Sequence, residues 1–300
     1  MRATLIHNPA AGDGQPSGAR LKRMLADAGL QVRYRSRKGD WKKALRDEAE
    51  LVIAAGGDGT VAKVALALSG SSTPLAILPL GTANNISRAL GIGGEVGELV
   101  EGWRKGRPQP LDIGVISAAW GETRFVESAG GGVFGRLIDA AADEVEKPRG
   151  LTGAVGDRAL HLLRRLLEQA TPRRWRLSLD GEDLSGDYVG VEALNIRFIG
   201  PKVPLAPDAD PGDGMLDVVL IGRRERDELI AYLDGRMAYA AAEMPRLTAR
   251  RGHRLHLVPP PSEPLHAGDS LLEPPADYDP PDGAANYDIL LRPKALLVYR

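Results

Sequence analysis

Three glycines surround one carboxylate in the stretch GGDGT (56–60), which directly follows the apolar run 51–55. Glycine costs conformational entropy, so a chain uses it where the backbone turns sharply or approaches another group closely. A helical pattern follows at once, and free backbone N–H groups at a helix N-terminus form an anion site. Asp58 can hold a metal ion directly or through water, and Thr60 adds a hydroxyl. The stretch therefore predicts a site for a phosphate group with its metal ion.

Two common phosphate-binding motifs do not match this stretch. A Walker A loop needs a Gly-Lys-Ser/Thr sequence, and none occurs in the chain. A dinucleotide-binding fingerprint that starts at Gly57 would need a further glycine at position 62, which is Ala62. A structural alternative stays open, in which GGDGT is a tight strand-to-helix turn and Asp58 is a solvated cap.

Two other turns repeat the pattern. In PLGTANN (79–85), a glycine and a threonine open a helix, and two asparagines add amide groups. Thr82 could equally be a plain helix N-cap. NPAAG (8–12) supplies Asn8 and Gly12 after the first strand, and alone it is a weak turn signal.

Short apolar runs alternate with helical patterns in the first third of the chain. Strands are predicted at 3–9, 30–36, 51–55 and 74–80, and helices at 16–29, 40–50, 60–68 and 82–90. Strands separated by helices indicate βαβ units and a parallel sheet. Because ligands of such sheets bind beyond the carboxyl ends of the strands, the three turns should meet at one edge.

From about residue 108 the pattern changes to strands that are largely antiparallel, interrupted by helices at 151–169 and 226–242. The letters Asp180-Gly181-Glu182 are predicted to form a hairpin turn, and the acidic, proline-rich stretch 269–286 an irregular loop. We therefore expect an α/β domain at 1–110, to which about 293–300 returns, and a β-rich domain at 111–292.

The composition is that of a globular chain, with 300 residues, 43% hydrophobic residues and a net charge of −1. A nearly neutral chain has no global basic field that would argue for nucleic acid as a partner. The absence of cysteine excludes disulfides and thiolate zinc sites and fits a reducing cytoplasm. Neither a signal peptide nor a membrane-spanning apolar run is evident, so we expect a cytoplasmic protein with at most peripheral membrane contact. The sequence does not indicate an oligomeric state.

Together, NPAAG, GGDGTVAKV and LPLGTANNISRALGI resemble the nucleotide-binding half of the diacylglycerol kinase catalytic family, which includes bacterial soluble lipid kinases and sphingosine kinases. The resemblance continues through ESAGGGVFG, EALNIRFIGPKVPLAPDADPGDGMLDVVLI and YDILLRPKALLVY, and so covers nearly the whole chain. It implies an α/β nucleotide-binding lobe, a β-sandwich-like lobe for the lipid, and an active cleft between them. It also implies phosphorylation of a lipid hydroxyl, with ATP as co-substrate and Mg²⁺ as cofactor.

The resemblance also implies roles for individual residues. ATP would be bound by Asn8, Ser36, Gly56, Gly57, Asp58, Gly59, Thr60, Thr82 and Asn84. Ser36 replaces a family threonine, and Arg35 is the other residue that could take its place. Mg²⁺ would be bound by the Asp213 carboxylate and the backbone carbonyls of Asp210 and Met215. The alternative for Asp213 is a plain Asp-Gly turn before a strand.

The residue that would accept the lipid hydroxyl proton departs from the family pattern. The family carries Asp-Gly-Glu near the C-terminus, and this chain has HAGDS at 266–270. Ala267 takes the aspartate position and Asp269 the glutamate position, so Asp269 is the expected base, with Glu273 as the alternative. The shorter arm of aspartate matters because a misplacement of about 1 Å can cost ~10²-fold in rate. Asp58 is expected to assist by organising the metal ion or the γ-phosphate.

Three alternatives stay open at the level of the sequence. Arginine-rich stretches at 164–176 and 246–254 are either solvated faces or attract an anionic bilayer during transient contact. An NAD kinase shares the GGDGT loop, but the Asn-Glu pair expected after LGTANN is missing. A nucleotide- or lipid-binding protein that has lost its base is supported only by the altered HAGDS stretch.

Overall fold

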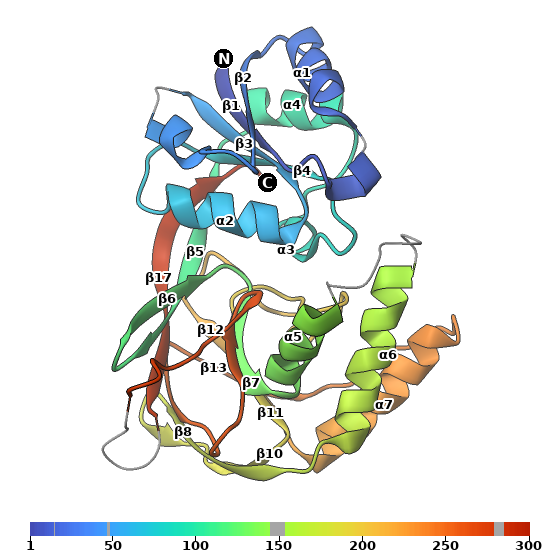
Figure 1. The fold of residues 1–300 in the computed structure, drawn as a ribbon, viewed down its shortest axis with the longest axis vertical. Helices are drawn as coiled ribbons and strands as arrows, with labels where there is room; N and C mark the ends of the chain where they lie inside the picture. Colours follow the sequence, from blue (N-terminus) through green and yellow to red (C-terminus); the bar gives the residue numbers. More distant parts are fainter. Residues whose placement is uncertain (15, 47–48, 145–153, 279–284) are drawn as a thin grey trace. The chain divides into compact units, whose positions relative to one another are not determined.

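The structure is a computed structural model that describes residues 1–14, 16–46, 49–144, 154–278 and 285–300. The chain forms two compact units (Figure 1). The first comprises Met1–Ile113, Pro211–Gly214 and Arg292–Arg300, and the second comprises Gly114–Asp210 and Met215–Leu291. The boundaries expected from the sequence, 110 and 293, fall close to two of these limits, but the sequence did not assign 211–214 to the first unit.

A parallel sheet forms the centre of the first unit. Its strands, in spatial order, are β2 (Gln31–Ser36), β1 (Arg2–His7), β3 (Leu51–Gly56) and β4 (Leu75–Pro79), and β17 (Tyr287–Val298) ends beside β4. The pairings among β1 to β4 are all parallel. Every residue of β3 is buried, as expected for the central strand of a sheet covered on both faces. The predicted α/β lobe is therefore confirmed.

Helices cover this sheet through narrow apolar stripes. Helices α1 (Gly18–Asp27) and α4 (Val96–Lys105) share one apolar cluster with the sheet, to which α1 contributes Leu21 and Leu25 and α4 contributes Val100 and Trp103. Helix α2 (Asp58–Leu68) buries Val61, Val64 and Leu68 and is followed after β4 by the short α3 (Asn85–Ala89). Ser17 caps α1 by accepting a hydrogen bond from the Arg20 N–H at 3.3 Å.

The helix predicted at 40–50 is wrong within the described residues. Only a 3-10 helix forms there, η2 (Lys42–Arg46), like the shorter η1 (Ala11–Gly14) after β1. The Ala44 N–H donates to the Trp41 carbonyl at 3.0 Å, which is the spacing of a 3-10 helix. Trp41 and Ala44 are both buried, and residues three apart lie on the same side of a 3-10 helix. Residues 47–48 lie outside the described part of the chain.

The second unit is built on two antiparallel sheets. One is a six-stranded sheet with the order β13 (Thr248–Gly252), β12 (Leu216–Ile221), β11 (Gly190–Leu194), β7 (Ser128–Gly132), β15 (Leu265–Ala267) and β16 (Ser270–Leu271). The other contains β10 (Gly186–Tyr188), β8 (Arg173–Leu179), β14 (Arg254–Val258) and the start of β17, with β9 (Glu182–Asp183) on β8. Strands β5 (Gln109–Ala118) and β6 (Gly121–Phe125) form a hairpin.

The two sheets of this unit pack face to face. Trp175 and Leu257 from one sheet share a buried cluster with Val191 and Val218 from the other. The free face of the six-stranded sheet is covered by α5 (Val133–Glu144), α6 (Ala154–Gln169) and α7 (Arg223–Met237), which bury a second cluster (Figure 1). The predicted β-sandwich-like lobe is confirmed. The cleft expected between the lobes stays a prediction.

Local expectations for this unit are largely met. Asp180 and Gly181 join β8 to β9 with φ of 51° and 90°, so the Asp-Gly-Glu letters at 180–182 form the predicted hairpin turn. Helix α6 agrees with the prediction at 151–169, of which 151–153 lie outside the described residues, and α7 ends at Met237 rather than at 242. In the predicted loop 269–286, β16 comes first and no helix or strand follows it as far as 278, while 279–284 are not described.

Across the described residues, none of the helices is both long and apolar enough to pass through a bilayer.

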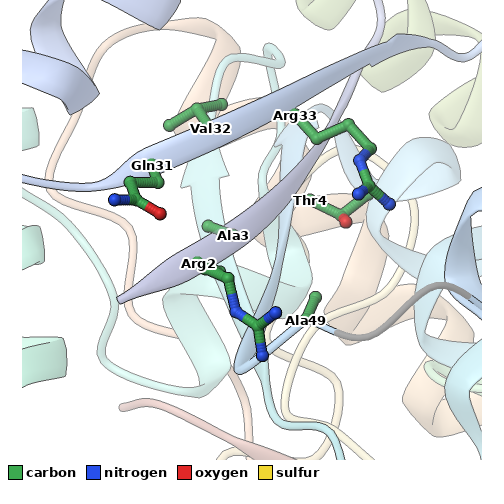
Figure 2. Close-up of a pocket in the computed structure, with 7 residues that line it drawn as sticks. All are labelled: Arg2, Ala3, Thr4, Gln31, Val32, Arg33 and Ala49. Atoms are coloured by element: carbon green, nitrogen blue, oxygen red, sulfur yellow. The ribbon is translucent and has the colours of Figure 1, made fainter.

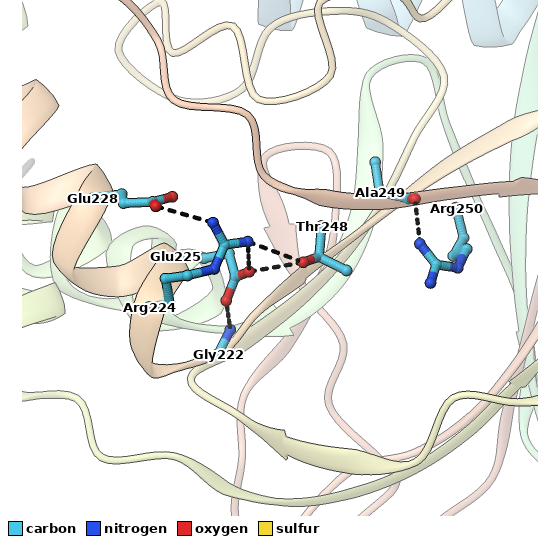
Figure 3. Close-up of polar contacts among 7 residues, drawn as sticks. All are labelled: Gly222, Arg224, Glu225, Glu228, Thr248, Ala249 and Arg250. Atoms are coloured by element: carbon cyan, nitrogen blue, oxygen red, sulfur yellow. Dashed lines mark hydrogen bonds and ion pairs between the residues drawn. The ribbon is translucent and has the colours of Figure 1, made fainter.

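A polar network fixes the start of α7 (Figure 3). The Gly222 N–H donates to Glu225 Oε2 at 3.1 Å, and the Thr248 hydroxyl donates to Glu225 Oε1 at 2.7 Å. Arg224 forms ion pairs with Glu225 at 2.6 Å and with Glu228 at 2.9 Å. Burial by itself would raise the pKa of Glu225, but the hydrogen bonds from Thr248 and the backbone, with the Arg224 charge, outweigh it and lower that pKa.

This lowered pKa predicts a pH-dependent stability. A carboxyl whose pKa is lower in the folded than in the unfolded state stabilises the fold above its unfolded pKa, and loses this effect as the pH falls through its folded pKa. Glu225→Gln should therefore lower the free energy of unfolding by about 1 kcal/mol at neutral pH, and the difference should shrink as the pH falls below the usual pKa of a glutamate and then through the lowered pKa of Glu225. Urea titrations of Glu225→Gln and of Glu228→Gln, at neutral and at acid pH, test this prediction. A deficit of Glu225→Gln that persists in acid would assign the effect to packing instead.

Candidate functional site

The three loops predicted from the sequence leave the parallel sheet at one edge. His7 at the end of β1 pairs with Ser36 of β2 and with Ala55 of β3, and Gly56 pairs with Pro79 of β4. The segments that follow therefore start side by side at the carboxyl ends of the strands. The Asn8 N–H donates to the Ala55 carbonyl at 2.9 Å and ties the first loop to the second.

Two of these loops touch backbone to backbone at Gly57 and Gly81. A Cβ atom added to Gly81 would lie 2.4 Å from the Gly57 Cα, and one added to Gly57 would lie 3.1 Å from the Gly81 Cα. The first loop joins them, because a Cβ on Gly12, whose φ is +58°, would lie 3.0 Å from the Leu80 carbonyl oxygen. Residues 8–12, 56–60 and 80–85 thus form one joined surface, here called the glycine rim.

Asp58 is the first residue of α2, and its carboxylate joins two loops of the glycine rim. Its Oδ1 accepts a hydrogen bond from the Ile86 N–H at 2.9 Å, at the start of α3. Burial raises the pKa of Asp58, and the hydrogen bonds from backbone N–H groups, with that of Ile86 the largest, only partly offset this rise. Asp58 is therefore not a solvated cap of its own helix, because its carboxylate accepts the Ile86 N–H at the start of the neighbouring α3. Its contact with a metal ion or a γ-phosphate stays a prediction.

Asn84 shapes the loop that Asp58 holds. Its φ of 52° and ψ of 44° are left-handed, a conformation that asparagine tolerates better than most residues. The Asn84 Oδ1 accepts from the Gly81 N–H at 2.9 Å, and its Nδ2 donates to the Gly81 carbonyl at 2.7 Å. Both the oxygen and the nitrogen of the Asn84 amide are thus bound to Gly81, so in this structure the side chain stabilises its own loop.

The other predicted nucleotide ligands differ in exposure. Thr82 is exposed on the glycine rim, while Thr60 is only 3% exposed and its side chain lies against Gly56. The Asn8 Oδ1 accepts from the Ala10 N–H at 3.3 Å, and the Ser36 Oγ accepts from the Lys38 N–H at 3.3 Å. The structure thus brings all of them to the carboxyl edge of the sheet, with the Thr60 hydroxyl turned to the interior.

A buried carboxylate that the sequence analysis missed holds the predicted metal loop. Asp112 of β5 is 0% exposed, and its Oδ2 accepts from the Gly214 N–H at 2.7 Å. Its Oδ1 accepts from the Lys294 N–H at 2.6 Å, and its own N–H donates to the Pro211 carbonyl at 2.7 Å. The local signal was an acid between two apolar strand residues, Leu111 and Ile113, which are both buried.

The loop 210–215 offers oxygen ligands of the kind that Mg²⁺ prefers. Asp213 is exposed at its tip, and Gly214 has a φ of +77° that a residue with a side chain would rarely adopt. A carboxylate and two backbone carbonyls make an all-oxygen donor set, which fits a hard cation. Within the described residues no group of three or more His, Cys, Asp or Glu side chains forms a metal site. The metal assignment of Asp213, Asp210 and Met215 therefore stays a prediction.

The predicted base lies on the hairpin between β15 and β16. Ala267 pairs with Ser270, so Gly268 and Asp269 form a two-residue turn, and Gly268 has a φ of +60°. Asp269 is exposed, and its Oδ1 accepts a hydrogen bond from the Ser270 hydroxyl at 3.1 Å. This position leaves its carboxylate accessible for proton transfer.

A hollow of about 260 Å³ lies elsewhere in the first unit, at the amino ends of β1 and β2 (Figure 2). Its lining consists of Arg2, Ala3, Thr4, Gln31, Val32, Arg33 and Ala49. The glycine rim begins after His7, at the opposite ends of the same strands. The hollow therefore contains none of the predicted site residues.

Comparison with known proteins agrees with this arrangement. Residues 2–116 match the model of the diacylglycerol kinase catalytic domain, and residues 138–297 match that of the YegS C-terminal NAD kinase beta sandwich-like domain. The second match alone covers more than half of the chain. The chain belongs to the diacylglycerol kinase family of lipid kinases. The resemblance stated from the sequence motifs is confirmed.

Several relatives of this lipid kinase are similar over most of their length. A protein of Klebsiella pneumoniae (strain 342) named "probable lipid kinase YegS-like" is 33% identical over 224 residues, which cover 71% of this chain and 72% of that protein. The diacylglycerol kinase of Bacillus subtilis (strain 168) is 29% identical over 241 residues, 76% of each chain. The crystal structure of a diacylglycerol kinase from Bacillus anthracis str. Sterne shares the fold, with a TM-score of 0.68 at 20% identity over 99% of this chain and 96% of that chain.

Proposed function

We propose that this lipid kinase transfers the γ-phosphate of ATP to the hydroxyl of diacylglycerol or a related lipid at a bilayer surface, assisted by Mg²⁺. The observation that carries the proposal is the close contact of Gly57 with Gly81, which joins the glycine rim at the carboxyl edge of a parallel sheet. Phosphoryl transfer needs mainly positioning and charge neutralisation, and a rigid rim of backbone N–H groups supplies both. The names of the relatives support a lipid acceptor.

The triphosphate would lie on the glycine rim. The N-terminal end of α2 presents backbone N–H groups and a partial positive charge, which favour a phosphate over water. Thr82 is exposed beside it and can donate a hydroxyl hydrogen bond. Asp58 holds the rim together through Ile86, so that the donors are in place before ATP arrives.

Asp269 would accept the proton of the lipid hydroxyl as that oxygen attacks the γ-phosphorus. An exposed carboxylate on a short turn can reach a substrate without moving the sheet behind it. Mg²⁺, held by the Asp213 carboxylate and the carbonyls of Asp210 and Met215, would neutralise phosphate charge. Asp112 fixes the loop that carries Asp213, through Gly214.

A lipid acceptor requires contact with a bilayer, for which the predicted basic stretches are the candidates. Several arginines of the predicted basic stretches already form ion pairs: Arg164 with Asp234 and Glu168, Arg173 with Glu263, Arg251 with Asp217, and Arg254 with Asp288. Such pairs weaken attraction to anionic lipid, since the arginine charge is neutralised locally. The exposed Arg165, Arg174 and Arg176 stay candidates for transient contact with anionic headgroups.

Incubation with γ-labelled ATP tests the proposal and its two rivals together. The acceptors are vesicles that contain diacylglycerol, phosphatidylglycerol, a sphingoid base or a polyprenol, and soluble NAD in a separate arm. We expect label in the lipid extract of at least one vesicle type, only when Mg²⁺ is present. Label on NAD would establish an NAD kinase, and ATP binding without transfer to any acceptor would establish a protein that has lost its base.

The proposed metal loop makes a separate prediction. Asp213→Asn should raise the Mg²⁺ concentration needed for half-maximal activity by about 10-fold or more, because one charged ligand becomes neutral. Asp208→Asn is the control, since Asp208 is an exposed acid on the same stretch that is not assigned to the metal. Mg²⁺ titrations at saturating ATP measure the effect. Equal Mg²⁺ dependence in the two variants would remove Asp213 from the site.

A further inference from the structure

Glu192 and His266 form a buried pair that the reaction described above does not use. Their side chains are 0% and 1% exposed, and His266 Nε2 lies 3.0 Å from Glu192 Oε1 and 3.1 Å from Oε2. A buried acid and a buried base are each costly unless they are paired, so Glu192 and His266 need each other. The pair lies within the second unit, on strands β11 and β15.

The strand between them is built so that they can meet. Gly130 of β7 pairs with Glu192 on one side and with His266 on the other. A Cβ on Gly130 would lie 2.9 Å from the Glu192 Cδ and 2.2 Å from the Val191 carbonyl oxygen. Only glycine therefore lets the carboxylate and the imidazole reach each other across β7, which accounts for one glycine of the ESAGGG stretch.

The pair is connected to the turn that carries Asp269. His266 Nδ1 lies 3.1 Å from the Gly268 carbonyl oxygen, which can only accept, so Nδ1 carries a proton. The Gly268 N–H donates to the Ser128 carbonyl at 2.8 Å, so both peptide groups of this glycine are bound. The Gly268 carbonyl belongs to the same peptide plane as the Asp269 N–H. Holding that carbonyl fixes the direction in which the Asp269 side chain leaves the turn.

The other half of the pair orients the imidazole. With Nδ1–H directed to Gly268, the remaining proton is shared between Nε2 and the Glu192 carboxylate. Glu192 therefore selects the ring orientation, and Ser128 adds a hydrogen bond to the Glu192 side chain. The chain of contacts runs from Ser128 and Glu192 through His266 to Gly268, and ends one residue before Asp269.

We propose that Glu192 and His266 are positioning residues for Asp269, holding the Gly268 carbonyl so that the carboxylate points at the lipid hydroxyl. The proposal rests on the proposed role of Asp269 as the base. A fixed turn matters in a chain with Ala267 and a shorter acid, because a small misplacement of the carboxylate costs rate.

Two amide substitutions separate positioning from simple packing. In His266→Asn, the side-chain Nδ2 can stand in for Nδ1 and still donate to the Gly268 carbonyl, but it cannot reach Glu192. In His266→Gln, the Nε2 can still reach Glu192, but the donor to Gly268 is lost. If the contact with Gly268 positions the base, kcat should fall by about 10- to 100-fold in His266→Gln and less in His266→Asn, with KM for ATP unchanged in both. Thermal stability should be lower in His266→Asn than in His266→Gln, because only His266→Asn removes the imidazole's contact with Glu192 without replacing it.

Amide hydrogen exchange at 267–270 supplies a readout that does not depend on activity. Exchange should speed up in His266→Gln and in Glu192→Ala, and stay unchanged in the control Thr248→Val, which removes a hydrogen bond at α7. If Glu192→Ala does not fold, Glu192→Gln replaces it, because glutamine preserves the shape of the side chain. The exchange rate at 267–270 should then increase by a smaller amount. Faster exchange with the expected kcat order supports the proposal. Unchanged exchange, or kcat that follows stability, overturns it. A wild-type protein that phosphorylates no lipid refutes the proposed function instead, and the exchange result still decides whether the pair holds the turn.

Discussion

Replacing Asp269 with asparagine should lower kcat for lipid phosphorylation by about 10²- to 10⁴-fold, the range typical for loss of a general base. Asparagine keeps the shape of the side chain but cannot accept the proton of the attacking hydroxyl. Asp269 is exposed on a two-residue turn, so the change should leave the fold intact. Affinity for ATP should also be unchanged, because Asp269 is not part of the glycine rim. Initial rates at saturating vesicles, with ATP binding by calorimetry, measure both quantities.

The matched control is Glu273→Gln, since Glu273 is an exposed acid shortly after the same hairpin and the alternative candidate for the base. It should keep kcat within about 3-fold of wild type, a difference well below that of a lost base. If Glu273→Gln is inactive and Asp269→Asn is active, the register at HAGDS was misassigned and Glu273 is the base. If both variants keep wild-type rates, neither acid accepts the proton.

Gly81→Ala should weaken ATP binding by about 10-fold or more, because it forces the two glycine loops apart. The added methyl group would lie 2.4 Å from the Gly57 Cα, and neither of the two backbones can rotate away as a flexible side chain could. A separation of about an ångström would misplace the phosphate-binding N–H groups on both loops at once. Calorimetric titration with ATP, with and without Mg²⁺, measures the loss.

Gly102→Ala is the control for the added methyl group. Gly102 lies in α4 of the same unit, and a Cβ there would meet no atom within 4 Å. This variant should bind ATP like wild type and be equally or slightly more stable, since alanine favours a helix over glycine. If Gly81→Ala also binds ATP like wild type, the contact between the loops does not matter for the nucleotide.

The sequence was most informative where one structural requirement determined the residue types of a short stretch. The continuous apolar run before GGDGT predicted a strand of a parallel sheet, and it forms β3, in which every residue is buried. The glycines at 57 and 81 marked close backbone approach, and the structure shows that each approaches the other. The hairpin at Asp180 followed from turn chemistry alone.

What the sequence could not show depends on partners far along the chain. Asp112 is 102 residues from Gly214 and 182 from Lys294, so no local pattern reveals that it holds both. Glu192 and His266 are 74 residues apart, and they become neighbours only through the pairing of β11, β7 and β15. Thr60 was assigned to the nucleotide because of its motif, but its position in the first turn of α2 places its side chain against Gly56.

Hydrogen exchange of the wild-type protein with and without MgATP tests most directly whether three loops bind one triphosphate. The account predicts slower exchange of amides in all three segments of the glycine rim, 8–12, 56–60 and 80–85, with no comparable change at 31–33 beside the hollow at the amino ends of β1 and β2. Protection confined to one of the three segments, or found only outside them, would contradict it.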